Sequence, residues 1–127
     1  MNLEMIAERL QDEGVGRMGQ TIFINHMPVE ASVGVLLRPP YVGTPIDYEL
    51  PGYRKTKFNA AVRGKNYKEA SALAQRVMEA LTFNDVEISG LEVRHVRPLT
   101  EPVSFPVSEG SMVEFLVIFE ATYVIVE

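Results

Sequence analysis

The chain has 127 residues, 46% of them apolar, and this size supports one domain with a buried core spanning residues 1–127. It contains no cysteine, which excludes a disulfide scaffold, a thiolate metal site and a cysteine nucleophile. A net charge of −5 disfavours direct binding of nucleic acid, because such binding rests on clustered lysine and arginine.

The amino-terminal segment carries acids such as Glu4 and Glu8 and lacks the basic start and continuous apolar run of a signal peptide. The most apolar stretch, Met112 to Val126, is interrupted by Glu114 and Glu120, and it falls short of the roughly 20 residues that span a bilayer. We therefore expect a protein that is made in the cytoplasm and does not enter a membrane.

The first predicted element is a helix that begins after Asn2, a good capping residue, and stops before Gly14. Its apolar face follows the i, i+3, i+4, i+7 spacing and consists of Leu3, Ile6, Ala7 and Leu10. Two short β-rich runs come next, Thr21 to Asn25 and Val33 to Leu37, and we expect them to be neighbouring strands.

Two proline-punctuated stretches, Arg38 to Gly52 and Pro98 to Ser111, are longer than the roughly 12 residues that connectors in compact domains rarely exceed. Both contain aromatic and β-branched residues, which disordered segments lack. We interpret them as arms that contact other chains. Because aromatic residues dominate interface hot spots, the residues expected in subunit interfaces are Tyr41, Tyr48, Tyr53 and Phe105. For Tyr53, packing back onto its own domain is an equal alternative.

From Arg54 onward the residues alternate, which predicts a half-buried strand with Thr56, Phe58, Ala60 and Val62 on one face. A second helix is predicted after Asn66, its N-cap, and it ends near Thr82 to Asp85. Val86 to Ile88 is a short strand or turn. A further strand follows, in which Leu91, Val93 and His95 share one face.

The final segment, Val113 to Val126, has the strongest β pattern and would extend roughly 45 Å at ~3.3 Å per residue. Because strands average about 5–6 residues, we expect it to overhang its domain or bend. Its second face, with Leu116, Ile118 and Val124, is too apolar to be left in water. The predicted fold class is α+β, a largely antiparallel sheet with two helices on one face and long proline-rich arms.

No chemical motif stands out. Neither His26 nor His95 has a second ligand at metal spacing, the glycines after the first helix lack a nucleotide-binding pattern, and no serine lies in a Gly-x-Ser-x-Gly elbow. We expect no catalytic residue, no cofactor, no metal and no enzymatic activity. The alternative from a different class is a small ligand-binding or enzymatic domain whose arms fold over a pocket containing His95, Asp47 and Glu49.

Four segments together resemble the small minor capsid and tail terminator proteins of tailed bacteriophages. They are IAERLQDEGVG (Ile6 to Gly16), TIFINHMP (Thr21 to Pro28), GVLLRPP (Gly34 to Pro40) and PGYRKTKFNAAVRGKNYKEASALAQRVMEAL (Pro51 to Leu81), in matching order along about two thirds of the chain. The resemblance implies a structural virion protein of the tail or neck, a subunit of a commonly hexameric ring. Such a ring caps the tail tube and docks the head-side connector.

The partners implied by the resemblance are further copies of this chain, a tail tube protein and a head-side neck or connector protein. DNA would pass through the ring without specific binding. An acidic chain suits that passage, because carboxylates repel phosphates. The acids that we expect to face the lumen are Asp85, Glu87 and Glu92, with ordinary solvated residues as the alternative. Another head-tail connector or minor capsid protein stays open as an alternative identity.

Overall fold

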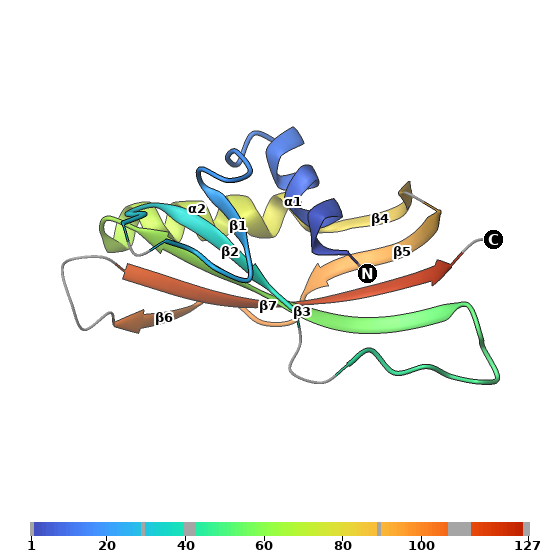
Figure 1. The fold of residues 1–127 in the computed structure, drawn as a ribbon. Helices are drawn as coiled ribbons and strands as arrows, with labels where there is room; N and C mark the ends of the chain where they lie inside the picture. Colours follow the sequence, from blue (N-terminus) through green and yellow to red (C-terminus); the bar gives the residue numbers. More distant parts are fainter. Residues whose placement is uncertain (1, 29, 40–42, 89, 107–112, 126–127) are drawn as a thin grey trace.

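The computed structural model describes residues 2–28, 30–39, 43–88, 90–106 and 113–125. The described part of the chain forms two α-helices and seven β-strands: α1 (Leu3–Asp12), β1 (Ile22–Ile24), β2 (Gly34–Arg38), β3 (Tyr53–Gly64), α2 (Tyr67–Ala80), β4 (Phe83–Ile88), β5 (Leu91–Pro98), β6 (Val103–Pro106) and β7 (Val113–Ile125). Both helices lie on one face of a single sheet (Figure 1). The predicted α+β class is confirmed.

Both helices begin at an asparagine, as predicted. The Asn2 side chain accepts a hydrogen bond from the backbone N–H of Glu4 at 2.9 Å, and the Asn66 side chain accepts one from Glu69 at 2.9 Å. Each bond satisfies a donor that the first helical turn leaves without a backbone partner. The side of α1 that faces the sheet is buried at Ile6, Ala7 and Leu10.

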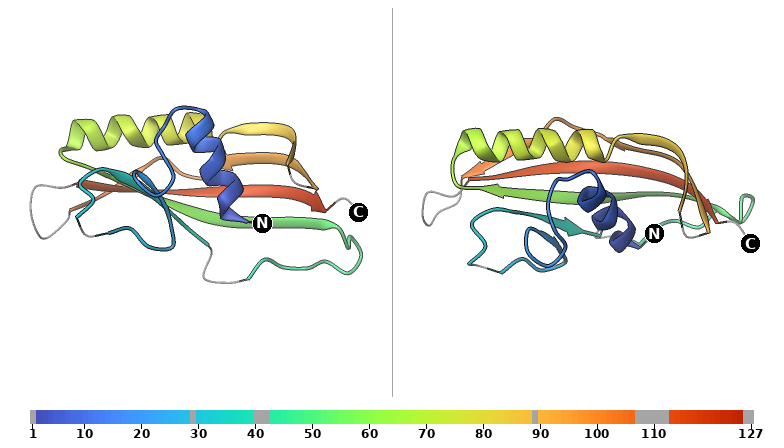
Figure 2. Two further views of the ribbon diagram at one scale, coloured as in Figure 1. Left: turned by 45° about the horizontal axis from the view of Figure 1, so that its top comes forward. Right: turned by 90° about the horizontal axis from the view of Figure 1, so that it is seen from above.

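Helix α2 lies over one half of the central strands β3 and β7 and packs against them (Figure 2). Its buried face is made largely of alanine, at Ala70, Ala74 and Ala80. At the end of β3, a Cβ atom on Gly64 would lie 2.6 Å from the backbone nitrogen of Ala70. Only glycine fits there, so this residue sets how tightly α2 can dock on the sheet.

The strand order is β1-β2-β3-β7-β5-β4, and β6 pairs with β7 beside β5. Strands β1 and β2 are neighbours, as predicted, and they pair in parallel, whereas the other pairs are antiparallel. Strand β7 is central. It pairs with β3 on one side from Val113 to Val124, and with β6 and then β5 on the other. Of the two alternatives predicted for this strand, that it overhangs its domain or bends, the pairing therefore rules out the overhang.

The core lies between the helices and one face of the sheet. Thr56, Phe58, Ala60 and Val62 of β3 are buried there, as the alternation predicts. The Phe58 and Phe119 rings, from adjacent strands, stack with their centroids 5.2 Å apart and their planes 11° apart. Offset aromatic pairs of this kind contribute beyond the area they bury, and this pair fixes the register of the two longest strands.

The long proline-rich arms of the predicted fold are not confirmed. Part of the second stretch, Val103–Pro106, forms strand β6, and residues 107–111 lie outside the described residues. In the first stretch, Arg38 belongs to β2, and residues 43–52 return along β3 (Figure 1). A hydrogen bond of 2.9 Å joins the hydroxyls of Thr44 and Thr56 and holds this segment to the sheet.

Candidate functional site

The face of the sheet opposite the helices carries charged side chains together with apolar ones. Cross-strand register places Lys55, Lys57 and Arg63 of β3 on this face, opposite Thr122, Glu120 and Glu114 of β7. Neither helix covers it (Figure 1). We refer to it as the helix-free face, and it holds the candidate functional surfaces.

Glu120 is the most buried charge on the helix-free face, with 8% of its side chain exposed. Its Oε1 atom lies 3.1 Å from the Arg97 guanidinium, 3.2 Å from Nε2 of His95 and 3.8 Å from Nζ of Lys55. Burial opposes ionisation of this carboxyl, but the hydrogen bonds to His95 and Arg97 and the nearby charge of Lys55 outweigh it. The pKa of Glu120 is lowered below its ordinary value of 4.5.

A bulge in β5 brings His95 into this cluster. The pairing with β7 shifts between Val93 and His95, so that Val93 faces the core opposite Tyr123 while His95 lies opposite Thr122. One extra residue reverses which side of a strand the later side chains occupy. The prediction that Leu91, Val93 and His95 share one face is therefore wrong.

The structure does not gather the residues of the alternative ligand pocket. Asp47 and Glu49 line a hollow between residues 45–49 and the start of β3, together with Tyr53 and Lys55 and without His95. The His95 ring is held by the Glu120 carboxylate and lies 3.0 Å from the Thr122 hydroxyl. A histidine committed to these contacts acts as a structural tie between β5 and β7.

The four aromatic residues predicted for interfaces are placed unequally. Tyr48 is 93% exposed, and Tyr53 is half-buried at the start of β3. Tyr41 and the side chain of Phe105 lie outside the described residues, although the backbone of Phe105 pairs with Glu114 in β6. Their place in an interface stays a prediction.

The acids predicted for the lumen come together at the β4–β5 hairpin. Asp85, Glu87 and Glu92 are exposed and line one shallow depression, next to Arg94. Glu87 and Glu92 are direct cross-strand neighbours, a like-charge pair that is destabilising by itself. The Arg94 guanidinium lies 3.3 Å from Glu92 and offsets part of the repulsion. Their orientation toward a lumen stays a prediction.

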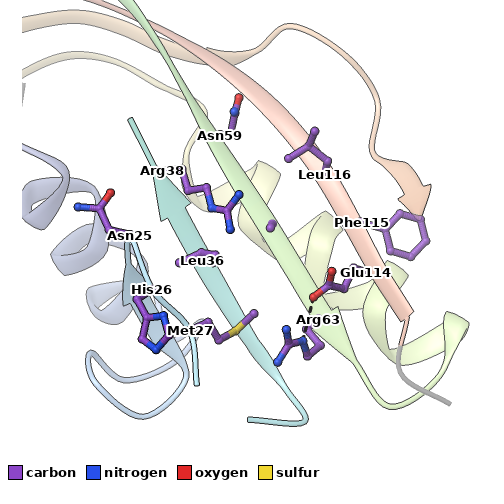
Figure 3. Close-up of a pocket in the computed structure, with 11 residues that line it drawn as sticks. Asn25, His26, Met27, Leu36, Arg38, Asn59, Arg63, Glu114, Phe115 and Leu116 are labelled. Carbon is purple, nitrogen blue, oxygen red and sulfur yellow. Dashed lines mark hydrogen bonds and ion pairs between the residues drawn. The ribbon is translucent and has the colours of Figure 1, made fainter. Parts of the chain in front are cut away.

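Sequence reasoning missed a second hollow of about 420 Å³ on the helix-free face (Figure 3). Beside it, Arg63 bonds Glu114 at 2.9 Å and donates to the carbonyl oxygens of Ala31 at 2.8 Å and Pro28 at 3.3 Å. These bonds hold the loop between β1 and β2 against the sheet. Only the outward position of Arg63 in the β3 alternation could have pointed to this site.

Within the described ranges, no group of three or more histidine or carboxylate side chains is placed to hold a metal ion. Neither described helix is long and apolar enough to cross a membrane. The geometry therefore offers surfaces, hollows and strand edges as its candidate sites.

A family model described as bacteriophage tail terminator protein matches residues 9–125. Among solved structures, a chain from the virion of a native gene transfer agent particle shares the fold, with a TM-score of 0.73 over 94% of this chain and 91% of that chain at 20% identity. No curated protein matches. The matched family is a structural component of the virion tail and neck, and its description names no enzymatic activity. Because that match covers nearly the whole fold, the chain belongs to the bacteriophage tail terminator family.

Proposed function

We propose that this protein forms a ring that caps the tail tube and joins it to the head-side connector. The resemblance described above implies a ring of six subunits. The observation that carries the proposal is the family match over residues 9–125. Heterologous contacts between identical subunits generate a ring when the rotation closes, and a ring can present two different faces to two different partners.

Open strand edges support assembly with other chains. Strands β1 and β4 stand at the two ends of the sheet order. The first half of β3 also lacks a strand on its second side, because β2 pairs only with Asn59 to Arg63 and residues 43–52 run beside it without strand pairing. Unpaired backbone donors and acceptors at an edge are a template for pairing with another polypeptide.

Exposed apolar side chains support the same conclusion. Ile46, Tyr48 and Leu50 are 58%, 93% and 53% exposed, and all three lie on the segment beside β3. A contiguous exposed apolar patch marks an interaction site. The proposed interface residues are Tyr41, Tyr48, Tyr53 and Phe105.

The acidic depression at the β4–β5 hairpin is proposed to face the channel of the ring. Three carboxylates, those of Asp85, Glu87 and Glu92, gather there around one arginine. Their net negative charge would repel the DNA backbone and limit its residence on the wall during passage.

The proposal is tested by mass photometry and negative-stain microscopy of the purified chain, alone and mixed with the tail tube protein of the same phage. We expect rings in solution or on tube ends, and tubes that stop growing once the protein is present. A chain of one or two copies that leaves tube growth unchanged would contradict the proposal. A ring that forms in solution but neither binds the tube nor stops its growth would identify a neighbouring neck protein.

A further inference from the structure

The hollow on the helix-free face has a physical cause in the sequence. Cross-strand register aligns Leu36 of β2, Ala61 of β3 and Leu116 of β7 in one row across the sheet. The middle residue contributes a single methyl group between two leucines, so the floor of the row is low. Met27, from the loop after β1, closes one side (Figure 3).

The rim of this hollow has an excess of positive charge. Arg38 and Arg63 both line it, and Arg63 is already paired with Glu114. Arg38, at the end of β2, is exposed and has no ion-pair partner among the described residues. The hollow is therefore apolar at its floor and available to an acidic partner at its rim.

The segment beside β3 has the complementary chemistry. A turn closed by the Leu50 N–H donating to the Asp47 carbonyl at 3.1 Å places Tyr48 at its tip. The Asp47 carboxylate accepts a further bond from the Glu49 N–H at 2.9 Å and stiffens the turn. An almost fully exposed tyrosine is thus presented between two carboxylates, those of Asp47 and Glu49.

We propose that this turn, residues 45–50 of one subunit, inserts Tyr48 into the hollow on the helix-free face of the next subunit. The two carboxylates then meet Arg38 at the rim, and the ring covers the apolar row Leu36, Ala61 and Leu116. The inference rests on the proposed ring and names the surfaces that close it. The occupant is a second copy of this chain, because knob and hollow are complementary in both charge and polarity.

A subunit does not fill its own hollow in this arrangement. The turn is tied to the start of β3, where the Tyr53 N–H donates to Leu50 at 2.9 Å and Arg54 donates to Pro51 at 2.8 Å. Ala61 lies eight positions further along the strand, about 26 Å away at ~3.3 Å per residue. Contacts that point from one place on a subunit to a different place on the next are heterologous, as a closed ring requires.

The absence of cysteine makes a covalent test clean, since any disulfide must use introduced residues. A chain carrying both Tyr48→Cys and Ala61→Cys, oxidised under ring-forming conditions, is expected to give a ladder of linked chains up to the full ring. Mixing the two single variants is expected to stop at a disulfide-linked pair of twice the 14.2 kDa chain mass. Each chain in this mixture carries one introduced cysteine and can therefore form only one disulfide.

Two other outcomes separate the inference from the function on which it rests. Rings of the double-cysteine chain that give no ladder, or a disulfide closed within single chains, would overturn the inference and leave the proposed ring intact. If the unmodified chain forms no ring, with or without its tail tube protein, the proposed function fails and the inference fails with it.

Charge exchange provides a second, non-covalent readout. Ring assembly, measured by light scattering, should be lost in Arg38→Glu and also in the double variant Asp47→Arg with Glu49→Arg. Combining the three substitutions in one chain should restore assembly. Tyr48→Ala should weaken assembly by about 30-fold, as expected for an interface hot spot. Leu99→Ala is the matched control, because Leu99 is also an exposed apolar residue, at 41%, and lines neither surface. Assembly unchanged by the charge variants would refute the proposed contact.

Discussion

Replacing Glu120 with glutamine should lower the free energy of unfolding by about 1–2 kcal/mol at pH 7. The shielded contact to His95 contributes about 1 kcal/mol, the usual net value of a hydrogen bond. Arg97 and Lys55 lie close, but their side chains are 55% and 56% exposed, so solvent screening leaves each worth only ~0.2–1 kcal/mol. The glutamine amide keeps the shape of the side chain and part of its hydrogen bonding, which limits the total loss of unfolding free energy.

The pH dependence gives this prediction its sign. The pKa of Glu120 is lowered in the folded protein, so the carboxylate contributes stability above its ordinary pKa of 4.5 and loses it as pH falls through the folded value. The difference between the natural chain and Glu120→Gln should therefore be largest near neutrality. It should shrink steadily below the ordinary pKa, where the natural chain also becomes neutral at this position.

Urea unfolding followed by far-ultraviolet circular dichroism measures this difference, at protein concentrations where light scattering reports single chains. Glu87→Gln serves as the control, because Glu87 is an exposed acid and its replacement should stay within about 0.5 kcal/mol. A Glu120→Gln penalty of equal size at pH 7 and pH 3 would refute the electrostatic reasoning and assign the effect to packing alone.

Two further predictions follow from the described geometry. Gly64→Ala should destabilise the subunit by about 1–3 kcal/mol in the same assay, since the new methyl group would overlap the backbone of α2, whereas Gly43→Ala, with open space around it, should be neutral. Glu87→Lys with Glu92→Lys should make assembled rings retain double-stranded DNA in a salt-dependent manner, measured by gel shift. The charge-matched control is Glu8→Lys with Asp12→Lys on α1. Equal DNA retention by the two variants would contradict the proposed channel position of the hairpin.

The helices were predictable because their signals are local. Asn2 and Asn66 cap the helices that they were predicted to cap, and the apolar spacing of α1 gave its buried face correctly. The prolines of the second stretch favour an arm over a strand, which is why β6 was not predicted. Strand β6 tolerates Pro106 because among the described strands it pairs with β7 alone, and because the proline is its last residue.

The features that could not be predicted depend on register between distant strands. In the sequence, Glu120 is only a charge that interrupts an apolar run. Its contacts with His95 and Arg97 depend on the β5 bulge, and no local sequence pattern predicts that bulge. The hollow likewise arises from alignment of Ala61 between two leucines of other strands. A single sequence indicates which face a residue takes in a regular strand, but it does not reveal bulges or cross-strand neighbours.

The central position of β7 has a consequence for how a subunit is made. This strand is C-terminal to every strand that it joins, so about half a chain length separates β3 from its longest neighbour. Pairings of such large sequence separation form slowly, and the half-finished sheet exposes the edge that β7 later fills. Until β7 has paired, the chain lacks the strand that joins β3 to β5 and β6, and the unpaired edge of β3 is open to non-native pairing with other copies.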